Sequence, residues 1–366
     1  MKKILIVIGN AGAGHMSCAN TTKEAILKKF PNAKVTIFDM YSLSRITKTY
    51  NFFYYVISRS IIAESIYNFF YKLIDKYTWY ANFSRILTVR PLRNLNKEFL
   101  EKYKPDTIIC NNALTVTVID DYCERFGKTF KYYITVPDLV TVSRWWASGH
   151  ADMIFCPTKE CVRRLKVFNR EVRTKCCYYP LRRIVPMSSR EVASTKRGIF
   201  KEIGFDLSKQ SVLVTGCGFA TGNIIAKMHL FIWKSNYQFI ILTGNDHILK
   251  KALELEFEGR RNVYISGFTD RIIDLMEVSD IVISKPGPAT LLEIERLNKR
   301  AIFTKAIGYQ EYGNVDYLSK NPNFLYIGSK YRQIPNQLRC LLERDLKSYK
   351  SDIKDINSIV ESIQEW

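Results

Sequence analysis

Short apolar runs alternate with helical stretches along this chain, and the alternation starts again near its middle. The runs of the first half are ILIVI at 4–8, KVTIF at 34–38, TIIC at 107–110, YYITV at 132–136 and MIFC at 153–156. Those of the second half are SVLVTG at 211–216, QFIILTG at 238–244, VYIS at 263–266, DIVIS at 280–284 and AIFT at 301–304. Strands separated by helices form parallel sheets with right-handed crossovers. The sequence therefore predicts an α/β fold with two Rossmann-like domains facing each other across a cleft.

The two sets of strands also place the domain boundaries. We predict an N-terminal domain over 1–184, a second domain over 185–338 and a helical segment over 339–366. Residues 184–208 connect the halves, with Pro186 and two serines leading into a polar helix. A chain of 366 residues is long enough to form two hydrophobic cores.

The charge of the chain is strongly basic and unevenly distributed. Of 55 Lys and Arg and 35 Asp and Glu, 30 and 14 respectively lie in residues 1–184, which gives +16 there and +4 in the rest. A cationic half indicates nucleic acid, an anionic membrane surface or an anionic substrate as a partner. We expect no nucleic acid, because no recognition motif for it occurs.

Cysteine and histidine are scattered rather than paired. The nine cysteines and four histidines include no C-x-x-C pair and no metal-ligand spacing. We therefore expect reduced thiols and no metal site. The opening KKILIVIG lacks the features of a signal peptide, and no run of 18 uncharged apolar residues occurs. The sequence predicts a cytoplasmic protein whose contact with a membrane, if it has one, is peripheral.

An aromatic-rich segment over about 44–100 interrupts the first half. Apolar residues recur in it at helical spacing, at Tyr55, Ile62, Ile66, Phe69, Phe70 and Leu73. Lys and Arg residues lie among them. Two interpretations stay open, a helix packed on the core and a helix that binds at a membrane interface.

The stretch GNAGAGHMS at 9–17 follows the first predicted strand, where ligands bind in open α/β sheets. A dinucleotide fingerprint fits poorly, because Ser17 stands where its third glycine belongs. Gly12 and Gly14 allow a tight turn and a close backbone approach. The loop therefore either holds a phosphate or places His15 beside a reacting hydroxyl.

Strand ends in the second half carry small and polar residues. TGCGFATGN at 215–223 and SKPGPATLLEIE at 284–295 each lead from a strand into a helix, whose first N–H groups can bind a phosphate. Glu293 lies one turn inside its helix, where a carboxylate can accept both hydroxyls of a ribose. GYQEYGN at 308–314 follows the next strand. These three strand ends predict a nucleotide site.

The motifs resemble those of GT-B glycosyltransferases of the family that includes monogalactosyldiacylglycerol synthases and processive diacylglycerol glucosyltransferases. The lipid II-forming transferase is a more distant relative of that family. Four blocks match in order: the loop 12–15, PDL at 137–139 with CPTKECVRRL at 156–165, KPGPATLLE at 285–293, and GYQEYGN at 308–314. The resemblance covers nearly the whole chain and implies the GT-B fold.

The resemblance also implies a function. The chain would be an inverting enzyme on the cytoplasmic face of a membrane, moving galactose or glucose from a UDP-sugar to diacylglycerol or a related lipid. UDP-sugar is a substrate, so no cofactor is expected. The open alternatives are a UDP-N-acetylglucosamine transferase with a polyprenyl-linked acceptor and a non-catalytic nucleotide-sugar sensor.

Residue roles follow from the same resemblance. His15 and Asp138 are the candidates for the general base of an in-line displacement. The donor-binding residues would be Gly218, Phe268, Gly287, Ala289, Thr290, Glu293, Gln310, Glu311 and Asn314. The residues assigned to the acceptor or the membrane are Gly12, Gly14, Tyr55, Phe69 and Phe70.

Overall fold

The first sheet consists of six parallel strands. The computed structural model describes residues 2–9, 13–43, 60–216 and 221–363. In this sheet the strand order is β2-β1-β3-β4-β5-β6. Its strands are β1 (Lys3–Ile8), β2 (Lys34–Asp39), β3 (Thr107–Cys110), β4 (Lys131–Thr135), β5 (Met153–Cys156) and β6 (Thr174–Cys176). Five of them were predicted; β6 was missed, because its residues TKC contain no apolar run.

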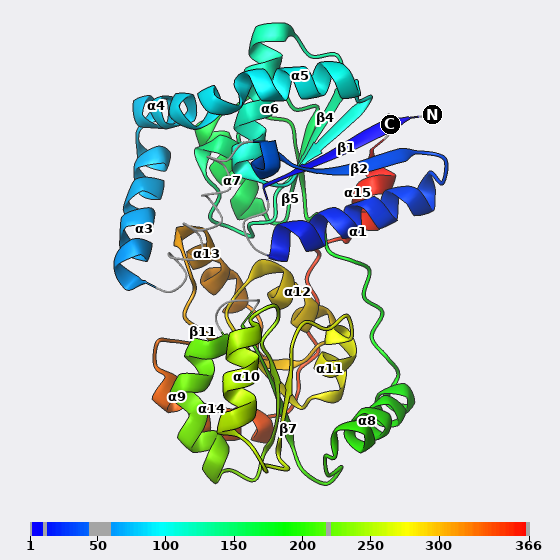
Figure 1. Cartoon of the computed structure of the whole chain (residues 1–366), viewed down its shortest axis with the longest axis vertical. Helices are drawn as coiled ribbons and strands as arrows, with labels where there is room; N and C mark the ends of the chain where they lie inside the picture. Colours follow the sequence, from blue (N-terminus) through cyan, green and yellow to red (C-terminus); the bar gives the residue numbers. More distant parts are fainter. Residues whose placement is uncertain (1, 10–12, 44–59, 217–220, 364–366) are drawn as a thin grey trace. The chain divides into compact units, whose positions relative to one another are not determined.

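Both faces of this sheet are buried, as the side chains of β1 show. Ile4, Ile6 and Ile8 point into one core and Leu5 and Val7 into another, because side chains alternate along a strand. The first core is closed by α1 (Ala13–Lys29) and α15 (Ile356–Ser362), which lie side by side in Figure 1. The second core is closed by α5 (Arg93–Tyr103), α6 (Ala113–Phe126) and α7 (Lys159–Phe168).

Helices α3 (Ile61–Lys76) and α4 (Thr78–Val89) come from the aromatic-rich segment. Ser60 caps α3 by accepting a hydrogen bond from the backbone N–H of Ala63, which fixes where the helix begins. The other short helices of this part of the chain are η1 (Met40–Leu43), η2 (Arg90–Leu92) and η3 (Arg144–Trp146). Among the described residues, no helix has the length and hydropathy needed to cross a bilayer.

The second sheet is also parallel and six-stranded, with the order β12-β11-β10-β7-β8-β9. Its strands are β7 (Ser211–Thr215), β8 (Gln238–Leu242), β9 (Val263–Ser266), β10 (Ile281–Ser284), β11 (Arg300–Thr304) and β12 (Phe324–Gly328). The edge strand β12 was not predicted. Its helices are α8 (Ser189–Ile203), α9 (Thr221–Lys234), α10 (His247–Glu256), α11 (Ile272–Val278), α12 (Pro288–Arg296), α13 (Tyr309–Leu318), η4 (Tyr331–Gln333) and α14 (Ile334–Glu343).

The polar helix predicted after Pro186 is α8. The Ser188 side chain accepts from the backbone N–H of Glu191, and the Glu191 carboxylate accepts from the backbone N–H of Ser188. This reciprocal capping box satisfies N–H groups that a helix start leaves without partners. One or two helices were also predicted in 334–366, and α14 and α15 are found there.

Contacts divide the chain into two compact units. Unit 1 comprises Met1–Arg183, Gly308–Asn314 and Asp352–Trp366, and unit 2 comprises Ile184–Ile307 and Val315–Ser351. Two short stretches from the second half of the sequence therefore belong with the first sheet. One of them is the GYQEYGN motif, and the other contains α15.

We expect Ile359→Ala to destabilise unit 1. Ile359 lies on α15 and is 2% exposed, in the core that α15 shares with α1 and β1. Removing most of a buried isoleucine costs about 2–5 kcal/mol of unfolding free energy, from lost burial and the cavity left behind. Urea denaturation followed by circular dichroism measures this, with the exposed Glu361→Ala on the same helix as control. Equal unfolding free energies for the two variants would show that α15 does not support this core.

Candidate active site

His15 lies in the first turn of α1, immediately after the loop that follows β1. Its Nδ1 atom is 2.9 Å from the backbone carbonyl oxygen of Asn111, and the side-chain Nδ2 of Asn111 donates to the carbonyl oxygen of His15 at 3.2 Å. Asn111 follows β3 and is fully buried. These two hydrogen bonds fix the imidazole at the carboxyl edge of the first sheet.

The partner of His15 determines which ring nitrogen can act as a base. A carbonyl oxygen only accepts hydrogen bonds, so Nδ1 carries the hydrogen and Nε2 of the neutral ring keeps its lone pair. Burial lowers the pKa of His15 below its ordinary value of 6.5, and the hydrogen bond to Asn111 opposes that change. The ring is therefore neutral at pH 7, with Nε2 able to accept a proton.

Asp138 lies on the same edge of the sheet, in the loop after β4. Burial and the negative charge of Glu311 together raise the pKa of Asp138 to about 7, with burial as the larger cause. Since β1, β3 and β4 are consecutive in the sheet, His15, Asn111 and Asp138 follow three neighbouring strands. The two residues predicted to be catalytic thus follow strands of the same sheet at its carboxyl edge.

Gly313 brings the GYQEYGN motif close to the loop that carries Asp138. A Cβ at Gly313 would lie 2.8 Å from the backbone nitrogen of Thr141 and 2.6 Å from the Cβ of Val140. Only glycine allows so close an approach of the two backbones. The buried carboxylate of Glu311 is thereby held near Asp138, which explains its effect on the pKa of Asp138.

The same motif is hydrogen-bonded to α3. The backbone N–H of Gly308 donates to Oε1 of Glu64 at 3.2 Å. The Tyr67 hydroxyl donates to Oε1 of Gln310 at 3.2 Å. The side-chain Nδ2 of Asn68 donates to the Tyr312 hydroxyl at 2.9 Å.

Sequence reasoning missed these α3 residues. The sequence did contain a signal for them, since a polar helix face lies opposite the apolar residues. It consists of Glu64, Tyr67 and Asn68. Polar residues on one face of an amphipathic helix ordinarily face water. Here Glu64 is 6% exposed and Asn68 is 8% exposed, so this polar face is buried.

Arg164 ties a further matched block to the motif. It lies on α7, within the block CPTKECVRRL, and donates to the Tyr309 hydroxyl at 3.2 Å. It also forms an ion pair with Asp75 of α3. Three of the four matched blocks thus contribute residues to unit 1.

The fourth block forms the start of α12 in unit 2. Gly287 is the N-cap residue, and Pro288 occupies the first helical position, where its fixed φ suits a helix. Ala289 and Thr290 follow in the first turn, and such a helix start presents N–H groups that can bind a phosphate. Glu293 lies one turn later and is buried.

The other residues predicted to bind the donor differ in how far they are buried. Phe268 follows β9 and is largely exposed. Gln310 is partly buried, and Asn314 is fully buried at the end of the unit 1 stretch. Gly218 lies outside the described residues. Since β9, β10 and β11 precede Phe268, Gly287 and Gln310, these residues follow carboxyl ends of strands of the second sheet.

Of the residues assigned to the acceptor and membrane, Gly12 and Tyr55 lie outside the described residues. A Cβ at Gly14 would meet no atom within 4 Å, so the space beside it is open. Phe69 and Phe70 are 58% and 46% exposed. The core-packing interpretation of these two side chains is therefore wrong.

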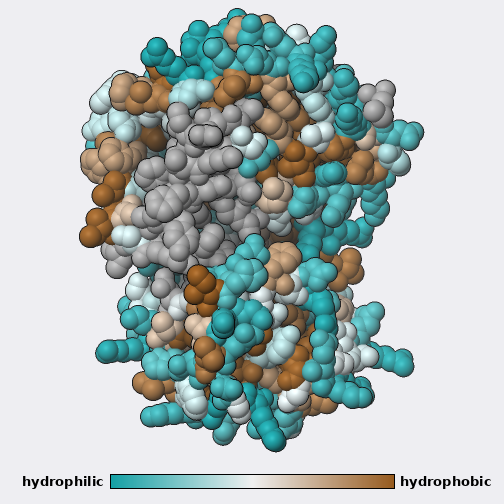
Figure 2. All heavy atoms as spheres, viewed as in Figure 1, coloured by the Kyte–Doolittle hydropathy of each residue, from teal (hydrophilic) through white to brown (hydrophobic). Residues whose placement is uncertain are grey.

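Phe69 and Phe70 belong to a larger apolar surface on α3 and α4. We call it the apolar face; its exposed members are Ile62, Ile66, Phe69, Phe70, Trp79, Phe83, Ile86 and Leu87. Brown side chains mark the outer side of these helices in Figure 2. An exposed apolar surface of this extent indicates a binding site for another apolar surface.

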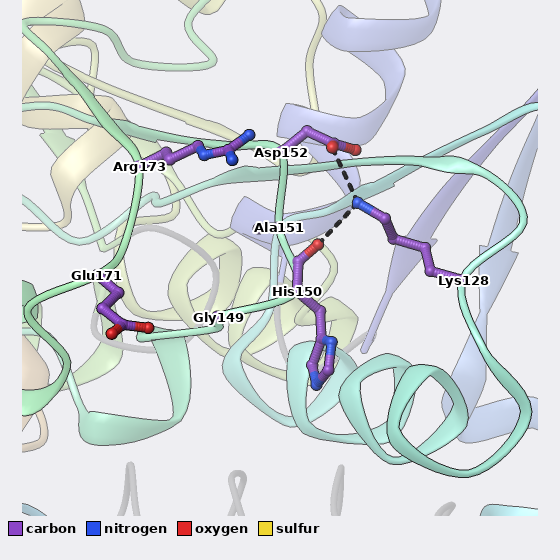
Figure 3. A pocket seen from close by; sticks show the side chains of 7 residues that line it. All are labelled: Lys128, Gly149, His150, Ala151, Asp152, Glu171 and Arg173. Carbon is purple, nitrogen blue, oxygen red and sulfur yellow. Dashed lines mark hydrogen bonds and ion pairs between the residues drawn. The ribbon is translucent and has the colours of Figure 1, made fainter.

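A polar hollow of about 360 Å³ lies at the opposite edge of the first sheet (Figure 3). Its lining residues precede β4, β5 and β6, so they lie at the amino ends of these strands. Lys128 bridges Asp152 and the carbonyl oxygen of His150 there. Within the described ranges, no cluster of three His, Cys, Asp or Glu side chains could hold a metal ion.

Two family models match the chain. Residues 15–174 match the model described as monogalactosyldiacylglycerol (MGDG) synthase. Residues 211–364 match the glycosyltransferase family 28 C-terminal domain. A processive diacylglycerol beta-glucosyltransferase of Bacillus licheniformis is 25% identical, over 97% of this chain and 91% of that protein.

Solved structures share the fold. MurG of Acinetobacter baumannii aligns with a TM-score of 0.58 at 10% identity, over 100% of this chain and 99% of that one. The spinosyn rhamnosyltransferase SpnG, complexed with thymidine diphosphate, aligns with a TM-score of 0.61 at 10% identity over 100% of both chains. The family resemblance and the GT-B fold predicted from the sequence are confirmed.

We expect the stability gained by Asp138→Asn, relative to wild type, to increase as pH rises from about 4 to about 8. The carboxyl ionises near 3.8 when unfolded and near 7 when folded. Between these values the folded state binds more protons than the unfolded state, so wild-type stability falls as pH rises. Asparagine does not ionise, so the Asp138→Asn variant does not lose stability in this way as pH rises. Melting temperatures of the two proteins across this pH range measure the difference.

Glu311→Gln supplies the control for this titration. Removing the Glu311 charge lowers the pKa of Asp138, because that charge is its second cause. In the Glu311→Gln background, Asp138→Asn should therefore add less stability. That stability gain should also reach its maximum at a lower pH. A gain that is independent of pH in both backgrounds would contradict the raised pKa of Asp138.

Proposed function

We propose that this chain, a GT-B glycosyltransferase whose two halves match glycolipid-synthase and glycosyltransferase family 28 models, moves glucose or galactose from a UDP-sugar to diacylglycerol or a related lipid. The observation that carries the proposal is the neutral His15 imidazole, with Nε2 available at a strand carboxyl edge. A binding protein without activity needs no such base. The relatives that match nearly the whole chain are named as diacylglycerol glucosyltransferases.

The chemistry assigned to the chain is a single displacement with inversion. Nε2 of His15 accepts the proton of the acceptor hydroxyl, whose oxygen attacks the anomeric carbon of the hexose. The bond between that carbon and the β-phosphate oxygen breaks, and UDP leaves with the electron pair. The N–H groups at the start of α12 stabilise the charge that develops on the diphosphate, without a metal.

Unit 2 is assigned to the donor. The carboxylate of Glu293 accepts hydrogen bonds from the two ribose hydroxyls, and Gly287, Ala289 and Thr290 bring backbone N–H groups to the diphosphate. The loop with Phe268 is assigned to the uracil. Gln310 and Glu311 of the GYQEYGN motif are assigned to the hexose.

Unit 1 is assigned to the lipid, and its apolar face is the peripheral membrane contact. The face presents exposed aromatic and aliphatic side chains, and residues 1–184, which include it, carry an excess of positive charge. Buried apolar side chains and basic residues near anionic headgroups both strengthen such binding. An acceptor with two acyl chains is reached most directly by an enzyme that lies on the membrane.

The transfer itself is tested with liposomes that contain diacylglycerol and either UDP-glucose or UDP-galactose. Mass spectrometry should detect a monohexosyl lipid with at least one donor. His15→Ala should lower turnover by about 10²- to 10⁴-fold, because the general base is lost. His229→Ala, on α9 of unit 2, is the matched control and should keep normal turnover. A His15→Ala enzyme with wild-type turnover would overturn the assignment of the base. A glycolipid formed with UDP-N-acetylglucosamine but with neither UDP-glucose nor UDP-galactose would overturn the assignment of the donor.

Glu293→Ala should weaken UDP binding by about 2–3 kcal/mol, the range for hydrogen bonds to a charged group. Isothermal titration calorimetry with UDP measures this directly. Glu293→Gln keeps the shape of the side chain and one acceptor oxygen, so its loss should be smaller. Unchanged UDP affinity in a folded Glu293→Ala protein would show that the ribose binds elsewhere.

Replacing both Phe69 and Phe70 with serine should reduce binding to anionic liposomes and leave UDP affinity intact. Binding should weaken as salt rises, because part of it is electrostatic. Liposome co-sedimentation measures it, with Leu207→Ser/Leu255→Ser as control, since these leucines are equally exposed but belong to unit 2. Sedimentation of both double variants like wild type would exclude the apolar face as the membrane contact.

A further inference from the structure

Helix α3 presents opposite chemistry on its two sides. The exposed side carries Ile62, Ile66, Phe69 and Phe70 of the apolar face. The other side carries polar groups that make hydrogen bonds to the GYQEYGN motif. A polar helix side is stable in a buried position only where its groups find partners, and this motif supplies them.

Gly308 shapes the motif so that the Gln310 side chain folds back over it. Gly308 has φ +78°, a conformation that side-chain-bearing residues rarely adopt. A Cβ there would lie 2.8 Å from Oε1 of Gln310 and 3.0 Å from its Nε2. The Gln310 amide therefore lies directly against the Gly308 backbone, whose N–H is held by Glu64.

Tyr67 holds this amide in place through a hydrogen bond. Its hydroxyl donates to Oε1 of Gln310, so the two N–H donors of Nε2 are directed away from that contact. An amide held in this way presents donors, and donors are what a sugar hydroxyl or a phosphate oxygen accepts from. Without the tyrosine hydroxyl, the amide loses the hydrogen bond that holds it in this position.

We infer that Tyr67 and Glu64 are positioning residues that hold Gln310 in the orientation needed to bind the hexose of the donor. This inference rests on the proposed function and on the assignment of Gln310 to the hexose. Tyr67 acts by holding the Gln310 amide, and Glu64 acts by holding the Gly308 backbone on which that amide lies. The hydroxyl pattern of the hexose is therefore selected in part by α3.

The inference is tested with a double-mutant cycle on Tyr67→Phe and Gln310→Ala. Tyr67→Phe should lower kcat/KM for the preferred UDP-hexose by roughly 3- to 10-fold, the effect of one lost neutral hydrogen bond. It should also bring the kcat/KM values for UDP-glucose and UDP-galactose closer together. In the Gln310→Ala background the same change should have no further effect, because Tyr67 acts through the missing amide.

Tyr77→Phe is the matched control, since it removes one hydroxyl at the C-terminal end of the same helix. It should leave kcat/KM and the donor preference unchanged. Glu64→Gln, which keeps an acceptor for the Gly308 N–H, should retain more activity than Glu64→Ala. Comparing Glu64→Gln with Glu64→Ala tests the role of Glu64 independently. Both changes affect the contact with the Gly308 N–H and leave the Tyr67 hydroxyl in place.

A loss from Tyr67→Phe that is equal in both backgrounds would overturn the inference, because it would show a role independent of Gln310. So would wild-type kcat/KM and donor preference in the single variant. Failure of the proposed function is a different result, since wild-type protein would then transfer neither hexose to the lipid. Thermal melts of each variant separate unfolding from a change at the site.

Discussion

Parallel strand pairing is the constraint on which the rest of this molecule depends. In a parallel sheet every strand ends at the same edge, so residues far apart in sequence meet there. His15 and Asp138 are more than a hundred residues apart, yet each follows a strand of the order β1-β3-β4. In the second sheet, the residues after β9, β10 and β11 likewise follow carboxyl ends of strands, with β7 and β8 lying between β10 and β9. Two sheets of this kind give the chain two such edges, one for the proposed base and the other for the proposed nucleotide site.

Much of this could be predicted because the signals are local. ILIVI reads as a buried strand since both of its faces are apolar. The strand β6 was missed because three half-buried residues at a sheet edge leave no apolar pattern. The partners of Gln310 were missed for another reason. Tyr67 is 243 residues away, and no local pattern connects a polar helix face to a distant loop.

Helix α3 buries its polar side because that side has hydrogen-bond partners within the protein. A helix with one apolar side ordinarily turns that side to the core. In α3 the carboxylate of Glu64 and the amide of Asn68 are buried, and the GYQEYGN motif supplies the polar groups that bind them. The hydrogen bonds to a fixed backbone segment hold the helix in this rotation, and its apolar side is left to bind something other than its own core. One helix thereby links a predicted membrane contact to a predicted sugar contact.

Burial changes the proton affinities of His15 and Asp138, the two candidates for the base, at the edge of the first sheet. The two pKa values move in opposite directions, because burial disfavours the charged form of each group, which is the imidazolium of His15 and the carboxylate of Asp138. Burial lowers the pKa of His15 below 6.5, so the neutral imidazole with an unprotonated Nε2 predominates at pH 7. Burial and the charge of Glu311 raise the pKa of Asp138 to about 7, so its protonated and ionised forms coexist near neutral pH. A protonated Asp138 can donate a hydrogen bond but cannot accept the proton of an acceptor hydroxyl. His15 can therefore accept a proton at any pH above its lowered pKa, whereas Asp138 can accept one only in the ionised form that becomes dominant above about pH 7.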